Sequence, residues 1–188
     1  MLIFLTIKSE YSSRRPIDDS LIEKISTGDT DAFRELYESA SKSIYGFALS
    51  ILKNSQDAED VLQETFIRVW DNSESYKPQG KPMAWIIRIA RNLAMTRLRE
   101  KGKHNQPDCV AQLPDFSSVS NSESRLLLEK LFGVLSDDEK QIVILHIAAG
   151  LKHRETAQLL GLPLGTVISK YNRALKKLRA ESGSDDYE

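Results

Sequence analysis

The side chains best suited to chemistry form a cluster of cations near the C-terminus. Between Leu164 and Ala180 the chain carries basic side chains and no acidic one. The basic residues are Lys170, Arg173, Lys176, Lys177 and Arg179. Lysine and arginine donate charge-assisted hydrogen bonds to phosphate, so this cluster is suited to binding a polyanion. The sequence shows no Ser/His/Asp set, metal-ligand cluster or phosphate-binding glycine loop, so we predict a binding protein that is not an enzyme and uses no cofactor.

Two short helices are expected to position these cations. Residues 151–179 break at Gly161 and Pro163, which suit a left-handed helix cap and the first turn of the next helix. Helical spacing predicts an apolar stripe on the second helix, made of Val167, Tyr171, Ala174 and Leu178. We expect its opposite face to carry Thr166, Ser169, Lys170, Arg173 and Lys177. The pattern is typical of a helix-turn-helix with a basic second helix, and a helical hairpin with a solvated basic face is the alternative.

Charge is unevenly distributed along the chain. The 188 residues carry a formal net charge of −1, with 40% hydrophobic and 28% charged residues, a composition that suits soluble domains with their own cores. A second basic block spans residues 81–103, whereas acidic residues gather at 57–74 and 115–139. Such separate basic and acidic regions indicate a protein that holds nucleic acid and another partner at the same time.

Cysteine usage and hydropathy limit the other possibilities. Cys109 is the single cysteine, so we expect no intramolecular disulfide and a reducing, cytoplasmic location. His104 and Cys109 alone are too few ligands for structural zinc, so we predict no metal site. The apolar start at residues 1–8 is too short for a signal sequence, and no run approaches the roughly 20 apolar residues of a membrane span. We therefore expect no membrane insertion.

Three helices are predicted in the N-terminal half. The first begins behind a cap at Asp29 or Thr30, the second spans 57–70, and the third begins at Pro82 after a polar loop at 71–81. The buried stripe predicted for the third helix is Trp85, Ile86, Ile89, Ala90, Leu93 and Leu98. Its polar, mostly positive face is Arg88, Arg91, Asn92, Thr96, Arg99 and Lys103. Such a helix could also lie on a membrane surface, an alternative that the alanines in its stripe disfavour.

The predicted elements make an all-α protein of two small helical domains joined by a flexible linker. The linker lacks a sustained period and contains prolines and serines. In the second domain, Ser136 and Glu139 form a capping-box pattern before an apolar helix. The predicted parts are a flexible N-terminal tail at 1–19, a helical domain at 20–101, the linker at 102–122, the helix-turn-helix domain at 123–180 and a C-terminal tail at 181–188.

Three motifs occur together in one known family. They are DAEDVLQETFIRVW at 57–70, AWIIRIARNLAMTRLR at 84–99 and RETAQLLGLPLGTVISKYNRAL at 154–175. In this order, and separated by a linker, they resemble bacterial RNA polymerase sigma factors of the extracytoplasmic-function (ECF) group, over residues 25–180. The sequence departs from that pattern at Ile168, Tyr171 and Leu175, where relatives usually carry a basic residue, leucine and arginine.

The resemblance implies a transcription initiation subunit. The first domain resembles sigma region two, a helical bundle that binds core RNA polymerase and recognises and opens the minus-ten promoter element. Its candidate core-binding residues are Asp57, Asp60, Gln63 and Glu64. Its candidate minus-ten DNA-binding residues are Tyr76, Lys77, Gln79, Arg88, Asn92, Thr96 and Arg99, of which the first three lie in a loop that could hold an extruded base. Trp85 could stack on a base, but we interpret it as a core residue.

The second domain resembles sigma region four, whose helix-turn-helix binds the minus-thirty-five element in the major groove. Its candidate DNA-binding residues are Arg154, Thr166, Ser169, Lys170, Arg173 and Lys177. The resemblance implies promoter-specific initiation of a stress or envelope-response regulon, with core RNA polymerase, promoter DNA and an anti-sigma factor as partners. The alternative is a two-domain helix-turn-helix regulator that does not join core polymerase, which the acidic, glutamine-bearing face at 57–70 disfavours.

Overall fold

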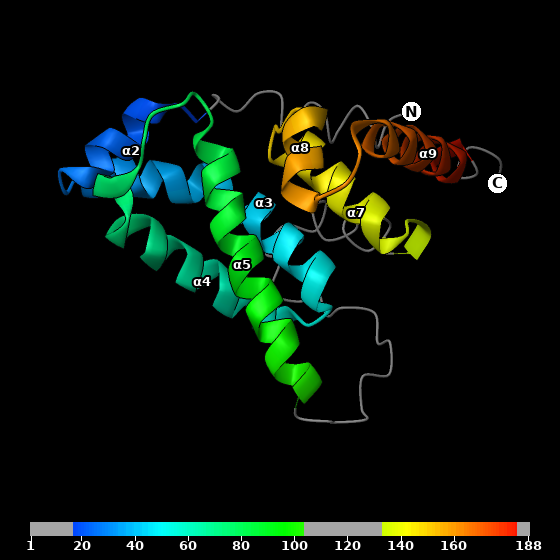
Figure 1. Cartoon of the computed structure of the whole chain (residues 1–188), viewed down its shortest axis with the longest axis horizontal. Coiled ribbons are helices and arrows are strands. Elements are labelled where there is room, and N and C mark those ends of the chain that lie inside the picture. The colour runs from blue at the N-terminus through cyan, green and yellow to red at the C-terminus, as the bar shows by residue number, and fades with distance from the viewer. Residues whose placement is uncertain (1–16, 104–132, 184–188) are drawn as a thin grey trace. The chain divides into compact units, whose positions relative to one another are not determined.

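The computed structural model describes residues 17–103 and 133–183, and helices dominate both ranges (Figure 1). Contacts divide the described residues into two compact units, an N-terminal unit at 17–103 and a C-terminal unit at 133–183. The predictions for residues 1–16, for most of the linker, for the apolar segment from Glu123 and for residues 184–188 lie outside the described residues. Among the described helices, none is both long and apolar enough to cross a lipid bilayer.

The N-terminal unit opens with a helix that the sequence did not lead us to expect. Helix α2 spans Asp19–Ser26, and the side chain of Asp18 caps it by accepting a hydrogen bond from the backbone N–H of Leu21 at 3.3 Å. Its apolar residues, Leu21, Ile22 and Ile25, are buried. The predicted flexible tail is therefore too long, because Asp18 and Asp19 belong to an ordered helix start.

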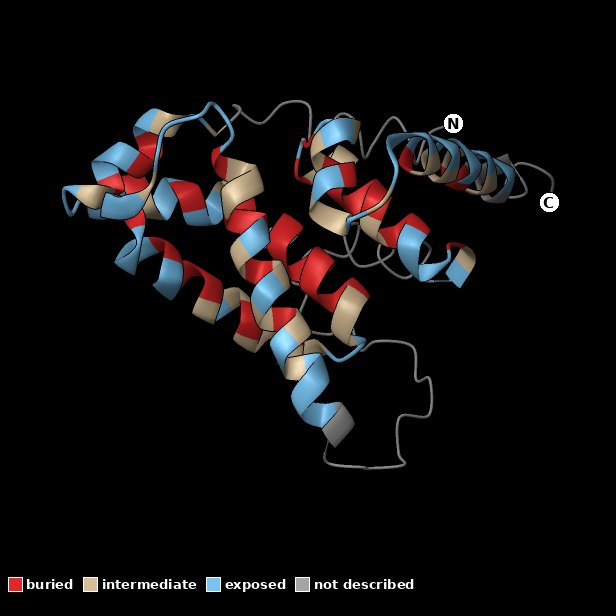
Figure 2. Cartoon of the chain, in the orientation of Figure 1, coloured by how far each residue is buried: buried red, intermediate tan, exposed pale blue. Residues whose placement is uncertain are grey.

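Helix α3, Thr30–Leu52, is the central element of this unit, since it packs against α2, α4 and α5. Asp29 caps it as predicted, accepting hydrogen bonds from the backbone N–H groups of Asp31 and Ala32 at 2.9 and 3.0 Å. Its second half is buried almost continuously, which Figure 2 shows as red along the ribbon. The helix ends at Lys53, whose φ of 55° places it in the left-handed region and turns the chain toward α4.

Helices α4 and α5 complete the bundle. Helix α4, Ser55–Asp71, starts slightly before the predicted position because Asn54 caps it. Its buried residues are Ala58, Val61, Thr65, Phe66 and Val69. A short 3-10 turn, η1 at Ser73–Ser75, lies in the predicted loop, and α5 then spans Pro82–Lys103 and begins at proline as predicted.

The buried side of α5 differs from the predicted stripe. Ile86 and Ala90 are buried as expected, but so are Ile87 and Ala94, which the prediction did not include. Leu98 is 43% exposed, so its assignment to the core is wrong. Residues 98–101 of α5 are all exposed, and Figure 2 shows this part of the helix in pale blue.

The C-terminal unit contains the predicted helix-turn-helix. Helix α7 spans Asp137–Val143 and continues into a π-helical turn, η2, at Ile144–Ala148. Helix α8, His153–Leu160, ends at Gly161, whose φ of 70° confirms the left-handed cap. Helix α9 spans Leu164–Gly183. Pro163 lies just before this helix rather than in its first turn, and its carbonyl accepts hydrogen bonds from Thr166 and Val167.

Two small apolar clusters hold α9 against the other helices of its unit, and they confirm its predicted stripe. Leu135 and Val143 pack with Ala174 and Leu178 in one cluster. In the other cluster Ile142 and Ala157 pack with Val167. Tyr171 packs against both clusters and so joins them.

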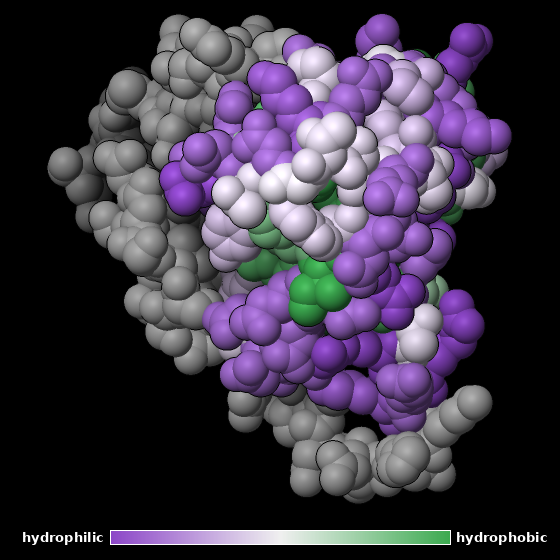
Figure 3. All heavy atoms as spheres, turned by 90° about the vertical axis from the view of Figure 1, so that its left-hand side faces the viewer, coloured by the Kyte–Doolittle hydropathy of each residue, from purple (hydrophilic) through white to green (hydrophobic). Residues whose placement is uncertain are grey.

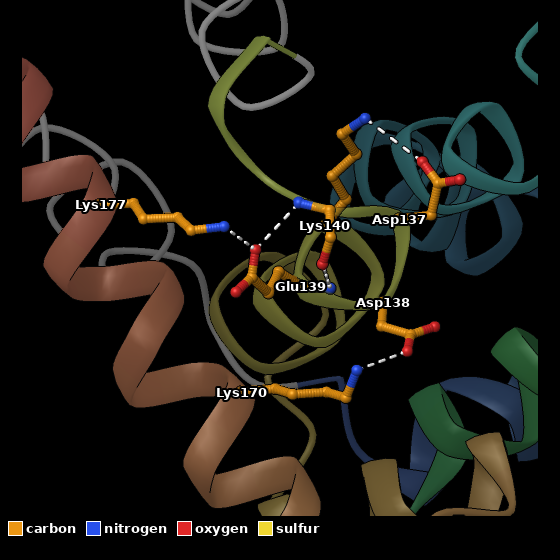
Figure 4. Close-up of polar contacts among 7 residues, drawn as sticks. Asp137, Asp138, Glu139, Lys140, Lys170 and Lys177 are labelled. Carbon is orange, nitrogen blue, oxygen red and sulfur yellow. Dashed lines mark hydrogen bonds and ion pairs between the residues drawn. The ribbon is translucent and has the colours of Figure 1, made fainter.

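Charged contacts between α7 and α9 supplement this packing (Figure 4). Glu139 is only 2% exposed, and its carboxylate accepts a hydrogen bond from Lys177 Nζ at 2.7 Å and one from the backbone N–H of Ser136 at 2.9 Å. The Ser136 hydroxyl accepts from the Glu139 N–H, so the predicted capping box is confirmed. Asp138 accepts from Lys170 Nζ at 2.6 Å. Lys170 and Lys177 therefore reach toward α7, and placing them on the face opposite the packed side was wrong.

The Glu139 carboxylate is held in its charged form. Burial raises the pKa of this group, but the hydrogen bonds from Lys177 and Ser136 outweigh burial and leave the pKa of Glu139 below its usual value. A carboxyl whose pKa is lower in the folded state stabilises the fold above its unfolded-state pKa. That stabilisation is lost as the pH falls through its folded-state pKa.

We predict that Glu139→Gln lowers the stability of the C-terminal unit by about 1–2 kcal/mol at pH 7, because Lys177 loses a charged acceptor while the capping geometry survives. The difference from the unmodified chain should shrink as the pH falls through the lowered folded-state pKa of Glu139, where the glutamate itself becomes protonated. Urea unfolding monitored by NMR of α7 and α9 amides, at pH 7 and along an acid series, would measure both effects. Asp138→Asn is the control, because its pair with Lys170 is exposed and should contribute less than about 1 kcal/mol. Equal losses in the two variants would contradict the role of Glu139.

Candidate nucleic-acid and protein interfaces

The exposed face of α9 is polar and cationic along its length. Ser169, Asn172, Arg173 and Lys176 are exposed, and Ile168 is 39% exposed among them. No acidic residue occurs in this helix before Glu181. A helix that is packed on one side and presents cations and amides on the other matches the requirements of the DNA major groove.

The structure separates the predicted minus-thirty-five residues into two groups. Arg154, at the start of α8, is exposed, as are Ser169 and Arg173 on α9. Thr166, Lys170 and Lys177 are half-buried, and the two lysines are paired with carboxylates of α7. The pair of Lys177 with the buried Glu139 is structural, because removing the lysine would leave a buried charge without its partner.

Asn172 and Lys176 lie on the exposed face but were missed as candidate contacts. With Ile168 they recur at every fourth position, which marks one edge of the helix. This spacing was available in the sequence. What the sequence does not give is the rotation of α9 about its own axis, which decides that this edge faces outward.

Three rings lie together beside the helix-turn-helix. His146 and His153 stack with ring centroids 4.1 Å apart, and Tyr171 packs against both at 4.7 Å. The Nδ1 atom of His146 lies 2.7 Å from the Leu151 carbonyl oxygen, so it carries the hydrogen and donates it. Burial, and then the neighbouring His146, lower the pKa of His153, which favours an uncharged ring at neutral pH. The three rings therefore pack together beside the turn that precedes α8.

A second polar row runs along α5. Arg88, Asn92, Thr96 and Arg99 are exposed and follow one another at nearly one-turn intervals, as predicted. The Thr96 hydroxyl donates to the backbone carbonyl of Asn92 at 3.0 Å, and the exposed Asn92 amide offers a donor and an acceptor of its own. The row has a cation at each end and two neutral hydrogen-bonding groups between them, a composition suited to a phosphate backbone and to bases.

The loop before α5 is anchored at both ends. The Tyr76 hydroxyl donates to Asp19 Oδ1 at 2.5 Å, and the Gly80 N–H donates to Asp19 Oδ2 at 2.6 Å. The Tyr76 ring packs against Trp85, with centroids 4.9 Å apart. Between these anchors Lys77 and Gln79 are exposed. Burial and the Asp19 carboxylate raise the pKa of Tyr76 far above its usual value, so its hydroxyl remains a donor.

The predicted core-binding acids differ in how they are engaged. Arg97 contacts Asp60 at 2.7 Å and Asp57 at 3.7 Å, and Lys101 also pairs with Asp57. These contacts fasten the start of α4 to the C-terminal turns of α5. The hydrogen bond from Arg97 lowers the pKa of Asp60, so that carboxylate is charged at neutral pH.

Farther along α4, Gln63 is exposed and Glu64 pairs with Arg68 at 2.9 Å. Ile67 is 55% exposed and Trp70 is 36% exposed on the same helix, features that sequence analysis did not single out. Tyr37 of α3 is 44% exposed and packs on Phe66, with ring centroids 4.7 Å apart. Figure 3 shows one face of the molecule, on which a small hydrophobic area lies among hydrophilic side chains. Exposed apolar and aromatic residues that gather beside polar ones are typical of protein-binding surfaces.

Both units match known protein families. Residues 36–104 match the Sigma-70 region 2 model, and residues 125–178 match the Sigma-70, region 4 model. The chain is 30% identical over 176 residues to the ECF RNA polymerase sigma factor SigW of Bacillus subtilis, a match that covers 85% of this chain and 94% of that protein.

Two solved structures share the fold at 23% identity. One is CnrH in complex with the cytosolic domain of CnrY, with a TM-score of 0.58 over 90% of this chain and 99% of that one. The other is the sigma factor RpoE in complex with the anti-sigma factor NepR from Bartonella quintana, with a TM-score of 0.56 over 79% of this chain and 94% of that one. The order of the two matched regions, the relative that covers nearly the whole length and the shared helical fold agree, and the chain belongs to the ECF group of RNA polymerase sigma factors.

Proposed function

We propose that the two units of this sigma factor divide promoter recognition between them. The N-terminal unit, predicted from the sequence as 20–101, binds core RNA polymerase and recognises the minus-ten element. The C-terminal unit, predicted as 123–180, recognises the minus-thirty-five element. The observation that carries this proposal is the exposed, acid-free face of α9 in a helix-turn-helix, together with a second polar and cationic row on α5.

For the minus-thirty-five element, Arg173 and Lys176 on α9 contact phosphates or base edges, while Ser169 and Asn172 donate and accept hydrogen bonds in the groove. Arg154 at the start of α8 contacts the phosphate backbone. Thr166 and Lys170 lie at the edge of this face and serve as secondary contacts. Lys177 does not bind DNA directly in this proposal, because its ammonium group neutralises the buried Glu139.

For the minus-ten element, the polar row of α5 lines the separated DNA strands. This row consists of Arg88, Asn92, Thr96 and Arg99. The loop residues Lys77 and Gln79 hold an extruded base. Extrusion costs stacking energy, so the loop must supply contacts to the base edge in return. Tyr76 supports this loop and does not contact the base, because its hydroxyl bonds to Asp19 and its ring packs against Trp85.

For core polymerase, we propose that Gln63 lies at the centre of the contact, with Glu64, Ile67 and Trp70 around it. Their mixture of amide, carboxylate and exposed apolar groups suits a protein partner. Asp57 and Asp60 support this surface by fixing α4 to α5 through Arg97 and Lys101. Like RpoE with NepR, the chain has an anti-sigma factor as a further partner in this proposal, and the apolar residues Ile67 and Trp70 are available to it.

Run-off transcription with purified core polymerase tests the proposal as a whole. Genomic promoter fragments incubated with core and the chain should give defined start sites, and either component alone should give none. Defined starts establish the proposed division of roles only if deletion of the minus-thirty-five or the minus-ten segment abolishes them. Tight duplex binding by the isolated chain, with no start site in the presence of core, would instead support a regulator that does not join polymerase.

Replacement of Gln63 by Ala should lower the affinity for core polymerase about five- to tenfold, because an amide at the centre of an interface is lost, while the helical content remains unchanged. Fluorescence anisotropy of labelled chain titrated with core would measure the affinity. Gln158→Ala removes an exposed glutamine from α8 and should bind core like the unmodified chain. Unchanged core affinity of the Gln63 variant would remove this residue from the interface.

Replacement of Arg173 by Ala should weaken binding of the holoenzyme to promoter duplex. It should also reduce the magnitude of the slope of log affinity against log salt concentration by about one, which corresponds to the loss of one contact. Arg34→Ala is the control, because it also removes one cation. Arg34 lies on the exposed surface of α3, where it pairs with Asp31, so this variant should leave the slope unchanged. Affinity measured at several salt concentrations distinguishes the two variants. A slope for Arg173→Ala equal to that of the control would exclude Arg173 from the DNA interface.

A further inference from the structure

We propose that Asp19 is a positioning residue for promoter recognition: its carboxylate fixes the loop at 76–80 in the conformation that receives a base of the minus-ten element. This inference rests on the proposed function, because it assigns a supporting residue to the same loop. Asp19 belongs to a segment that the sequence indicated was only a flexible tail, and none of the three sequence motifs includes it.

Both oxygens of the carboxylate are used. Oδ1 accepts from the Tyr76 hydroxyl at 2.5 Å and Oδ2 accepts from the Gly80 N–H at 2.6 Å. These contacts connect residues that are 57 and 61 positions apart in the sequence, so they are tertiary contacts rather than local turns. One side chain therefore fastens both ends of the short segment that contains Lys77, Pro78 and Gln79.

The anchor itself is firmly placed. Asp19 is the first residue of α2, whose start is capped by Asp18 and whose residues Leu21 and Ile22 are buried in the N-terminal unit. Helix α2 also packs against η1, the turn that leads into the loop. The carboxylate is thus held by a packed helix, while Lys77, Pro78 and Gln79 in the loop that it holds are exposed.

The loop needs such an anchor. Its exposed residues make no regular backbone ladder, and Gly80 has a φ of 67°, in the left-handed region that favours glycine. The Tyr76 ring rests against Trp85 at the start of α5, so the same tyrosine connects the anchor to the helix that carries the polar row. A loop that is ordered before DNA arrives loses less conformational entropy when it receives a base, and it discriminates better between bases that fit and bases that do not.

The geometry also predicts how substitutions at position 19 differ. In Asp19→Asn the amide oxygen can accept from Gly80, and the amide nitrogen can donate to the Tyr76 oxygen, since a phenol hydroxyl both donates and accepts. Asp19→Ala removes both bonds. Tyr76→Phe removes the bond to Asp19 Oδ1, leaves the bond from Gly80 to Oδ2 and keeps the ring against Trp85. The expected order of loop disturbance is therefore Asp19→Ala, then Tyr76→Phe, then Asp19→Asn.

The experiment uses holoenzymes assembled from core polymerase and full-length variants, on a promoter chosen by start-site mapping with the unmodified chain. Each minus-ten position is replaced in turn by the other bases, and initial transcription rates give the preference at each position. For Asp19→Ala the base preference should fall about fivefold at the minus-ten position whose base the loop receives. This loss is equivalent to one or two hydrogen bonds. Preferences at other positions, core affinity and minus-thirty-five duplex binding should each change less than about twofold.

Tyr76→Phe should show a smaller loss at the same position, and Asp19→Asn should retain most of the preference. Asp31→Ala is the matched control, because it removes an acid from the first turn of α3 that pairs with the exposed Arg34 rather than with the loop. Unchanged base preference in both Asp19→Ala and Tyr76→Phe would overturn the inference. So would an equal loss at every minus-ten position, which indicates general destabilisation.

If Asp19→Ala does not fold, Tyr76→Phe decides the question by the same readout. If the unmodified holoenzyme initiates at defined starts but shows no base preference at any minus-ten position, the proposed role of the loop fails before Asp19 is tested. Failure of the function and failure of the Asp19 inference are therefore distinguishable.

Discussion

Pairing of carboxylates with cations on neighbouring helices determines which positive charges of this protein are available to DNA. In the C-terminal unit the acids of the first turn of α7 engage Lys170 and Lys177, and in the N-terminal unit the acids of α4 engage Arg97 and Lys101. The cations outside these pairs, such as Arg173 on α9 and Arg88 on α5, are exposed. A net charge close to zero is therefore compatible with two local cationic faces, since the acids neutralise cations that hold the fold.

These pairs contribute differently to stability. Lys170–Asp138 is a surface pair, and pairs of this kind contribute little. Lys177–Glu139 involves a buried carboxylate that also completes a helix cap, so it connects the start of α7 to the C-terminal half of α9. The same residues that orient α9 therefore leave its opposite edge open. In a sigma factor this has a functional consequence, because the orientation of the recognition helix and its availability to the groove are set by the same contacts.

The N-terminal unit combines a rigid framework with a small presented loop. Helix α3 provides the buried centre, and α4 and α5 pack against it with their polar faces outward. Protein-binding and DNA-binding residues can then occupy different helices of one bundle: Gln63, Ile67 and Trp70 on α4, and the polar row on α5. The loop between these helices is held by Asp19 from α2, so a third helix fixes a segment that lacks regular structure.

Local patterns in the sequence determined most of the helices, several of their caps and the family. Asp29, Ser136 with Glu139, and Gly161 act on residues within one turn of themselves, so their roles follow from spacing alone. Only the tertiary structure decided which charged residues are free, because that depends on the rotation of each helix and on partners such as Arg97 and Asp60, which lie 37 positions apart. For the same reason the sequence did not reveal Asp19 as an anchor or Leu98 as exposed. A helical repeat specifies which residues share a face, but the neighbours packed around the helix decide where that face points.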